Sequence, residues 1–302
     1  MAALEIVRAQ AALSRIGWGA REIGLKRIIA GLARLGLLIA SRPSRAEITT
    51  TNSGLRIAFN CRTQLMPLLI VFQELLEPEL DAVQRLLGPS AVAIDVGASI
   101  GTWTLWAAKT GATVYACEPD AQNLTMLMKN VRSNGLEANV IAHSCALGPG
   151  EGWSTANGQA GGYGLNFKLA ASVGQPCGGR VQSLDHFVRE IGVTRVDVLK
   201  VNTAGCEADV LAGGIELFRQ QKVGTAMFLD GLEVRPRLDE LRQFSYELGF
   251  YDGHKRQFLP VGGSNHLDNL RPGPANRYVV VKHASVSLCA PNNVPSADHR
   301  TL

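Results

Sequence analysis

Residues 91–120 constrain the fold of this chain more than any other segment. An apolar run leads into the turn DVGASIG at residues 95–101, and a helical segment follows over residues 102–109. A second apolar run, residues 112–117, ends at Glu118. The order is strand, glycine turn, helix, strand and acid, which is typical of one half of a nucleotide-binding α/β unit.

Each part of this pattern has a physical role. Gly97 and Gly101 let the backbone turn sharply and approach a ligand that a β-carbon would hold away. The following helix directs its unpaired N–H groups and the positive end of its dipole toward the same ligand. Glu118 offers two carboxylate oxygens to the hydroxyls of a ribose. The expected ligand is an adenosine-type nucleotide.

Three kinds of site compete for the turn. A dinucleotide site needs G-x-G-x-x-G, and Ser99 and Thr102 replace two of those glycines. The G-x-S-x-G elbow of α/β-hydrolases matches residues 97–101, but it needs core strands upstream and gives Glu118 no role. S-adenosylmethionine has no pyrophosphate, so it tolerates fewer glycines, and it uses both the turn and the acid. This methyl donor is favoured.

An ordered series of short segments runs through residues 46–283. The segments are FQE at 72–74, IDVGASIG at 94–101, CEPD at 117–120, NL at 123–124, KNV at 129–131, NG at 134–135, ALG at 146–148, SLD at 183–185 and VLKVNTAGCE at 198–207. With them the chain resembles the FkbM-like branch of class I S-adenosylmethionine-dependent methyltransferases. The resemblance implies a Rossmann-like, seven-stranded α/β fold and O-methylation of a hydroxyl on a sugar or natural product.

One segment departs from the family pattern. Where the family has Lys-Ile-Asp-Val-Glu-Gly, this chain has KVNTAG at residues 200–205, so Asn202 and Ala204 replace two acids. The segment ends a predicted strand, at the edge where open α/β sheets hold ligands. Asn202 can accept a hydrogen bond, but it is neither a base nor a good ligand for a hard divalent cation. We therefore expect a metal-independent reaction and no metal site.

Methyl transfer to a hydroxyl requires in-line alignment and removal of the hydroxyl proton. The candidates for catalytic roles are Lys200, Asn202, Glu207, Asp230 and His254. Lys200 would act as a base only if burial lowered its pKa. The missing acids leave two alternatives open. The chain could be a catalytically degenerate partner or scaffold, or it could methylate a nitrogen that is already unprotonated.

The expected donor-binding residues gather in the turn, at the ends of neighbouring strands and on the helix upstream. Contacts are expected from Asp95, Gly97, Ala98, Ser99 and Gly101 in the turn, Glu118 and Pro119 at the ribose, Ser144, Cys145 and Ala146 around the adenine, and Asn202 near the methionine end. Glu74, on an apolar stretch, would close over the donor's amino group. The alternative for Glu74 is a solvated helix acid.

Residues 1–45 form a basic, amphipathic helical extension with eight basic side chains and two acids. Its expected partner is a membrane surface, the core of this chain, or a second subunit in a homodimer. The rest of the chain is close to neutral, which argues against a nucleic-acid substrate. The expected partner of the catalytic part is therefore a small-molecule acceptor.

The remaining organisation follows from turn signals and periodicity. Residues 46–90 are expected to hold a β-hairpin around Asn52-Ser53-Gly54 and a helix over 65–87 interrupted at Pro78. Residues 91–284 would form the methyltransferase domain. It would include one helix from about 206 to 221 and a final antiparallel pair at 244–252 and 277–283. Residues 285–302 are expected to form a disordered tail.

Two further features were interpreted from composition. The glycine-rich stretch between residues 148 and 179 carries Tyr163 and Phe167, which suggests a lid over the acceptor or an ordinary edge hairpin. The six cysteines form no C-x-x-C motif, and Cys117 is expected in the core. Reduced cysteines and the lack of a secretory signal pattern predict a cytoplasmic protein, with membrane association open through the extension.

Overall fold

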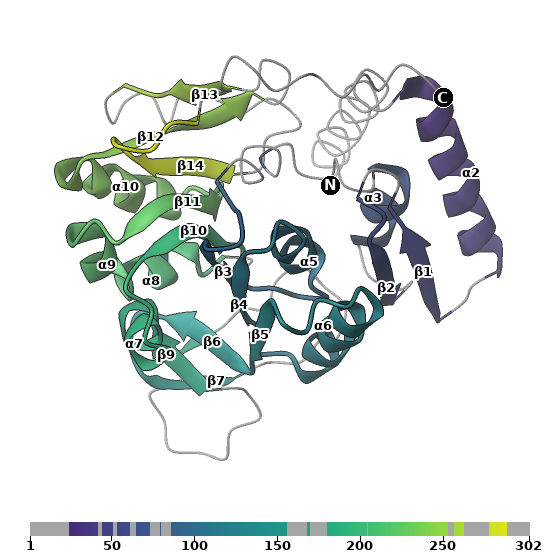
Figure 1. Ribbon diagram of the computed structural model, residues 1–302, viewed down its shortest axis with the longest axis horizontal. Coiled ribbons are helices and arrows are strands. Elements are labelled where there is room, and N and C mark those ends of the chain that lie inside the picture. Colours follow the sequence, from purple (N-terminus) through teal and green to yellow (C-terminus); the bar gives the residue numbers. More distant parts are fainter. Residues whose placement is uncertain are drawn as a thin grey trace.

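The computed structural model describes residues 24–41, 44–50, 53–60, 65–72, 79, 86–155, 168–169, 180–203, 205–252, 257–262 and 278–288. Figure 1 shows a central sheet with helices on both sides and a helical arm at one edge. None of the described helices is long and apolar enough to cross a membrane. The predicted boundaries of the domains stay predictions.

The central sheet is mixed and contains eight strands. They are β3 (Val92–Val96), β4 (Thr113–Cys117), β5 (Val140–His143), β10 (Val196–Val201), β11 (Val223–Leu229), β12 (Tyr246–Asp252), β13 (Gln257–Pro260) and β14 (Tyr278–His283). Their order is β13-β12-β14-β11-β10-β3-β4-β5. The five strands from β11 to β5 are parallel, and β14 and β12 add the antiparallel pair. This confirms the predicted Rossmann-like α/β class.

The eighth strand corrects the expectation of seven. β13 lies in the segment interpreted as a loop, and it pairs antiparallel with β12 in the register Asp252↔Gln257 to Gly249↔Pro260. Such a short strand, bounded by glycine-rich sequence, has too little alternation of its own to be recognised. Its place is set by the neighbouring edge of the sheet.

Helices cover both faces of the sheet. They are α5 (Thr102–Ala108), α6 (Ala121–Ser133), α7 (Leu184–Glu190), α8 (Glu207–Ala212), α9 (Ile215–Arg219), α10 (Val234–Asp239) and a 3-10 turn at Glu240–Phe244. Successive residues of the central strands enter different apolar clusters. Ala93, Val198, Met227 and Val280 pack with α5 and α6, whereas Ile94, Leu199, Phe228 and Val281 pack with the helices from α7 onward. Burial on both faces explains why these strands read as continuous apolar runs.

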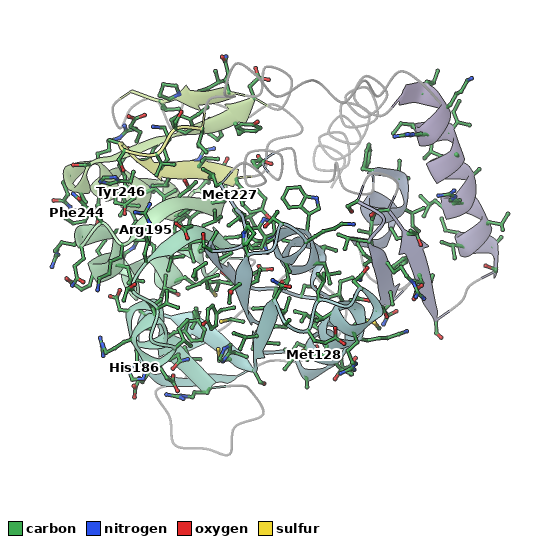
Figure 2. The ribbon with its side chains drawn as sticks, viewed as in Figure 1. Met128, His186, Arg195, Met227, Phe244 and Tyr246 are labelled. Carbon is green, nitrogen blue, oxygen red and sulfur yellow. The ribbon has the colours of Figure 1, made fainter. Side chains whose placement is uncertain are left out.

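The last helices are tied to the sheet by aromatic side chains. Tyr246, at the start of β12, donates a hydrogen bond to the Val223 carbonyl at 2.6 Å, and its ring lies 5.3 Å from that of Phe218. Phe244 lies close to Tyr246 (Figure 2). The guanidinium carbon of Arg219 lies 5.6 Å from the centre of the Phe244 ring. Burial raises the pKa of Tyr246 to about 12. Its hydroxyl therefore stays a hydrogen-bond donor.

The single helix expected from 206 to 221 is wrong, because two helices occupy this segment. The break falls at Gly213 and Gly214. A β-carbon on Gly213 would lie 2.0 Å from the Gly148 carbonyl oxygen, and one on Gly214 would lie 2.6 Å from a methyl carbon of Leu184. The Asp185 carboxylate then accepts the first N–H groups of α9, at 3.2 and 3.0 Å. Close packing, which sequence periodicity does not report, divides the helix.

A second, four-stranded sheet lies beside the first. Its strands are β6 (Cys145–Gly148), β7 (Gly152–Thr155), β8 (Lys168–Leu169) and β9 (Arg180–Ser183), in the order β6-β9-β7-β8. β7 and β8 pair antiparallel, which agrees with the edge-hairpin interpretation of this stretch. Tyr163 and Phe167 lie outside the described residues, so the lid stays a prediction.

The predicted N-terminal hairpin is confirmed. β1 (Arg45–Thr49) and β2 (Arg56–Asn60) pair antiparallel, and the Thr50 hydroxyl contacts Ser53 and accepts the Leu55 N–H within the turn. The buried Asn130 side chain of α6 bonds both backbone groups of Ala58 at 2.8 and 3.0 Å. This contact attaches the hairpin to the main core.

Helices α2 (Leu25–Ser41) and α3 (Leu65–Phe72) complete the N-terminal part. Most of the expected helix after residue 72, including Glu74, lies outside the described residues. At the other end, Leu288 is buried in the main core. Residues 285–288 therefore differ from the disordered tail that was expected, and residues 289–302 lie outside the described part.

Candidate donor-binding and active site

The glycine turn lies at the point where the strand order reverses. β3 and β10 are neighbours, and the chain continues from them toward opposite edges of the sheet. Gly97 has φ +76°, and a β-carbon there would lie 2.0 Å from the carbonyl oxygen of Asn202. Gly97 thus lets the two strand ends touch. Open α/β sheets bind ligands at this reversal of strand order.

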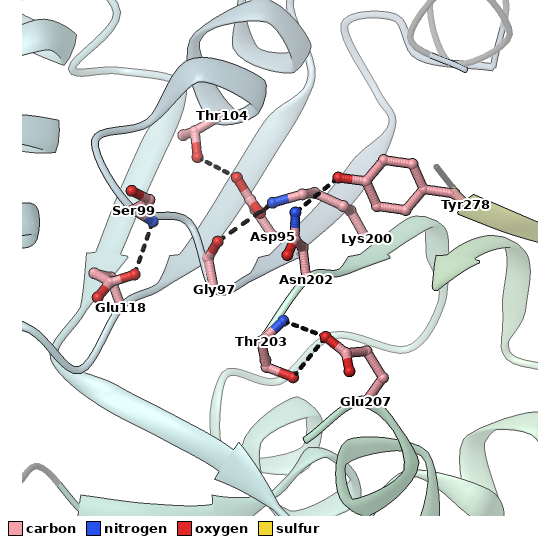
Figure 3. Close-up of polar contacts among 10 residues, drawn as sticks. All are labelled: Asp95, Gly97, Ser99, Thr104, Glu118, Lys200, Asn202, Thr203, Glu207 and Tyr278. Carbon is pink, nitrogen blue, oxygen red and sulfur yellow. Dashed lines mark hydrogen bonds and ion pairs between the residues drawn. The ribbon is translucent and has the colours of Figure 1, made fainter. Parts of the chain in front are cut away.

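A buried ion pair holds the turn from beneath. The Lys200 ammonium lies 2.8 Å from one oxygen of Asp95 and 3.3 Å from the Gly97 carbonyl, while Thr104 donates to the other Asp95 oxygen at 2.6 Å (Figure 3). The Asp95 side chain is 0% exposed. Asp95 therefore positions the turn through Lys200 and Thr104, and the expected contact between Asp95 and the donor stays a prediction.

Glu118 links the end of β4 to the turn. One carboxylate oxygen accepts the Ser99 N–H at 2.7 Å, and the other accepts from Asp120 N at 3.0 Å and the Asn123 side chain at 3.4 Å. Burial raises the pKa of Glu118, and these three hydrogen bonds oppose that shift. Because an ionised carboxylate offers about four acceptor sites, the oxygen facing Ser99 keeps capacity for a ribose hydroxyl.

The expected adenine contacts are placed unevenly. Ser144 is exposed and Ala146 is half-buried, whereas the Cys145 side chain is buried in the core with Cys117. A hydrogen bond from Cys117 lowers the pKa of Cys145, and burial raises the pKa of Cys117. Cys145 can therefore meet an adenine only through its backbone. The expected core position of Cys117 is confirmed.

The other turn and ribose residues lie where the strands end. Ala98 is buried, Pro119 is half-buried, and Gly101 precedes α5 with φ +88°. A β-carbon on Gly101 would lie 3.0 Å from the Leu127 side chain of α6. Gly101 therefore lets α5 and α6 approach each other behind the turn.

Asn202 follows the last residue of β10. Its N–H donates to the Val96 carbonyl at 3.0 Å, and its side-chain amide donates to the Tyr278 hydroxyl at 2.9 Å (Figure 3). The Tyr278 N–H in turn donates to the buried Glu79 carboxylate at 3.3 Å. With its Nδ2 directed at Tyr278, the side chain presents Oδ1 as a hydrogen-bond acceptor.

Glu79 is a buried acid near the candidate site that the sequence interpretation missed. A buried acid on an apolar helix was expected at Glu74, which lies outside the described residues. The same signal is present five positions later, and the structure connects Glu79 through Tyr278 to Asn202. The contact of Glu79 depends on the packing of β14, which the local sequence does not report, and the role expected for Glu74 stays a prediction.

Two other catalytic candidates, Glu207 and Asp230, form hydrogen bonds within the described part of the protein. Glu207 accepts the Thr203 N–H at 2.8 Å, the Thr203 hydroxyl at 3.3 Å and the Gly205 N–H at 3.0 Å. Asp230 binds Arg235 through both oxygens, at 2.7 and 2.6 Å. Glu207 thus shapes the loop after β10, and Asp230 anchors the start of α10. His254 and Ala204 lie outside the described residues.

The sequence model of the methyltransferase FkbM domain matches residues 95–263, more than half of the chain. The chain belongs to this methyltransferase family. The match includes the glycine turn, Glu118, the buried ion pair and the altered strand end after β10. No curated protein sequence matches this chain.

Several methyltransferases are among the solved structures that resemble this chain. The FkbM methyltransferase of Methylobacillus flagellatus KT shares 15% identity over 88% of this chain and 60% of its own length, with a TM-score of 0.42. A human methyltransferase 10 domain containing protein shares 16% identity over 77% of this chain and 89% of its own length, with a TM-score of 0.46. TrmK of M. capricolum, solved with S-adenosyl-homocysteine, shares 12% identity over 68% of this chain and 66% of its own length, with a TM-score of 0.37. This chain thus spans under two thirds of the Methylobacillus enzyme.

Proposed function

We propose that this FkbM-family methyltransferase transfers the methyl group of S-adenosylmethionine to a hydroxyl on a small molecule such as a sugar or natural product, without a metal ion. The observation that carries the proposal is the bond between Glu118 and Ser99, which joins the ribose acid to the glycine turn at the reversal of strand order. Bound there, the donor supplies a methyl group on a positively charged sulfur.

The chain's own residues fit this donor. Gly97 provides backbone without a β-carbon next to Asn202, and the Glu118 oxygen that accepts the Ser99 N–H keeps capacity for a ribose hydroxyl. Asn202 Oδ1 would accept a hydrogen bond from the donor's amino group, because Tyr278 holds the amide nitrogen on its other side. These contacts would align the sulfonium without placing a second charge beside it.

The metal-independent part of the proposal rests on charge and ligand type. A divalent cation prefers carboxylate oxygens, and Asn202 provides only an amide oxygen at this strand end. The nearby Asp95 carboxylate is bonded to the Lys200 ammonium at 2.8 Å, and that positive charge would repel a metal ion. Orientation of the two substrates then supplies most of the rate enhancement.

Calorimetry with S-adenosylmethionine tests the proposal at Glu118. We expect Glu118→Ala to weaken donor binding by up to about 100-fold, since a hydrogen bond to a charged group contributes about 1.5–3 kcal/mol and one ribose hydroxyl would lose such a bond. The donor affinity of Glu118→Gln should lie between those of the unmodified protein and Glu118→Ala, because glutamine keeps one acceptor oxygen. Glu137→Ala, at an exposed acid just after α6, is the matched control and should bind normally. If the unmodified protein does not bind the donor, the proposal is overturned.

A second candidate is favoured by the engaged carboxylates. Among the described candidates, Glu207 and Asp230 already accept hydrogen bonds from the protein, and Lys200 is an ion-paired ammonium without a lone pair to accept a proton. A nitrogen nucleophile that is already unprotonated would need no strong base. A protein that binds the donor and acts only as a scaffold would need none either.

Acceptor panels separate these functions. We expect the unmodified protein to methylate hydroxyl acceptors, measured as transfer of labelled methyl groups. Transfer to amines alone would favour the nitrogen nucleophile. Donor binding without transfer, with activity appearing in the Asn202→Asp, Ala204→Glu double variant, would identify a degenerate site, because a positioned base contributes about 10²–10⁴-fold to the rate.

A further inference from the structure

Helix α2 exposes an unusual amount of apolar surface. Among the described residues, eight large hydrophobic side chains are exposed, and five of them belong to this helix. They are Leu25 (61% exposed), Ile29 (57%), Leu32 (43%), Leu37 (75%) and Ile39 (58%). Isolated exposed hydrophobics are common, but a group on one short helix marks an interaction surface.

One face of α2 packs against the rest of the protein. Ile28 is buried against Val71 and Phe72, and a β-carbon on Gly31 would lie 2.9 Å from the Val71 Cα. Leu35 and Leu38 also face the main core. The helix is therefore fixed in rotation on α3, and the exposed side chains lie beside this packed face, on the helix that Figure 1 shows at the margin of the molecule.

The exposed residues form a stripe along the helix. Leu25, Leu32 and Ile39 recur every seven residues, and Ile29 lies one turn from Leu25 and Leu32. At 1.5 Å per residue, this stripe extends over about 20 Å. It is long enough to rest on a surface and too short to cross a bilayer.

Positive charge accompanies the stripe. α2 contains the exposed Lys26, Arg27 and Arg34 and no acidic residue. An apolar stripe beside basic side chains is typical of helices that lie in the interface of an anionic membrane. A second copy is disfavoured, because a two-fold contact through this helix would bring the basic side chains of two copies close together.

We propose that α2 docks this protein on an anionic lipid surface. Leu25, Ile29, Leu32 and Ile39 enter the boundary between headgroups and acyl chains, while Lys26 and Arg34 contact the acidic headgroups. The buried contacts of Ile28 and Gly31 with α3 transmit this attachment to the rest of the fold. The inference does not depend on the proposed methyl transfer.

Vesicle sedimentation of the full chain tests the docking. We expect binding to phosphatidylcholine vesicles that contain phosphatidylserine, weak binding to phosphatidylcholine alone, and release by salt. Two double variants should each reduce partitioning onto the vesicles more than about tenfold. One replaces apolar residues (Ile29→Glu with Ile39→Glu), and the other reverses charges (Lys26→Glu with Arg34→Glu). Leu232→Glu, at an 83% exposed apolar residue far along the chain, is the matched control and should bind normally.

Other outcomes overturn the proposal. Equal binding to both kinds of vesicle, or unchanged binding by the α2 variants, would remove the anionic lipid as partner. A dimer in sedimentation analysis that the same variants dissociate, without vesicle binding, would assign the face to a second copy. Circular dichroism would confirm that each variant keeps its helical content.

Discussion

Replacement of Lys200 with methionine is expected to lower the free energy of unfolding by about 3–5 kcal/mol, because it leaves a buried charge without its partner. The Asp95 carboxylate is fully buried, and Lys200 lies 2.8 Å from it. Thr104 would still donate its hydrogen bond, but one hydrogen bond does not replace a cation. Chemical denaturation of the unmodified and variant proteins measures the loss.

A double variant tests whether the loss of stability comes from the unpaired Asp95 charge. Asp95→Asn combined with Lys200→Met removes both charges, and we expect it to recover more than half of the lost stability. Lys222→Met, at a lysine in the turn before β11, is the control for loss of a lysine from the same protein. A cost below about 1 kcal/mol for Lys200→Met would contradict the buried pair, since that is the range of a surface salt bridge.

The same pair shows what the sequence could predict and what it could not. The strand, the glycine turn and the acid of residues 92–118 were recognised because apolar runs and glycines report local backbone structure. Asp95 and Lys200 are 105 positions apart, and nothing in either segment reveals that they meet. The sequence pattern therefore identifies candidate residues, whereas the contacts among them depend on how the strands are ordered in the sheet.

Local rules failed where tertiary packing decides. The break between α8 and α9 depends on what Gly213 and Gly214 touch, and β13 depends on the free edge of β12. The hydrogen bond from Ser99 to Glu118 was not predicted either, although both residues were expected in the site. In each case the deciding partner lies outside the local sequence pattern.

Gly97→Ala is expected to weaken both the fold and donor binding. The alanine Cβ would lie 2.0 Å from the Asn202 carbonyl oxygen, against an ordinary contact of about 3.5 Å, so the ends of β3 and β10 would have to separate. The left-handed backbone at φ +76° adds about 1–2 kcal/mol. We expect stability to fall by about 3 kcal/mol or more, and donor affinity in calorimetry to fall by at least about 30-fold.

Gly135 provides the control that isolates the clash. It has φ +66°, close to the value at Gly97, and a β-carbon there would meet no atom within 4 Å. Gly135→Ala therefore carries the backbone cost alone, and it should destabilise the protein by about 1–2 kcal/mol without changing donor affinity. The difference between the two variants measures the contact between the turn and Asn202. If Gly97→Ala costs no more than Gly135→Ala and binds the donor normally, the two strand ends do not form one site. The altered residue at position 202 would then have no direct effect on the donor.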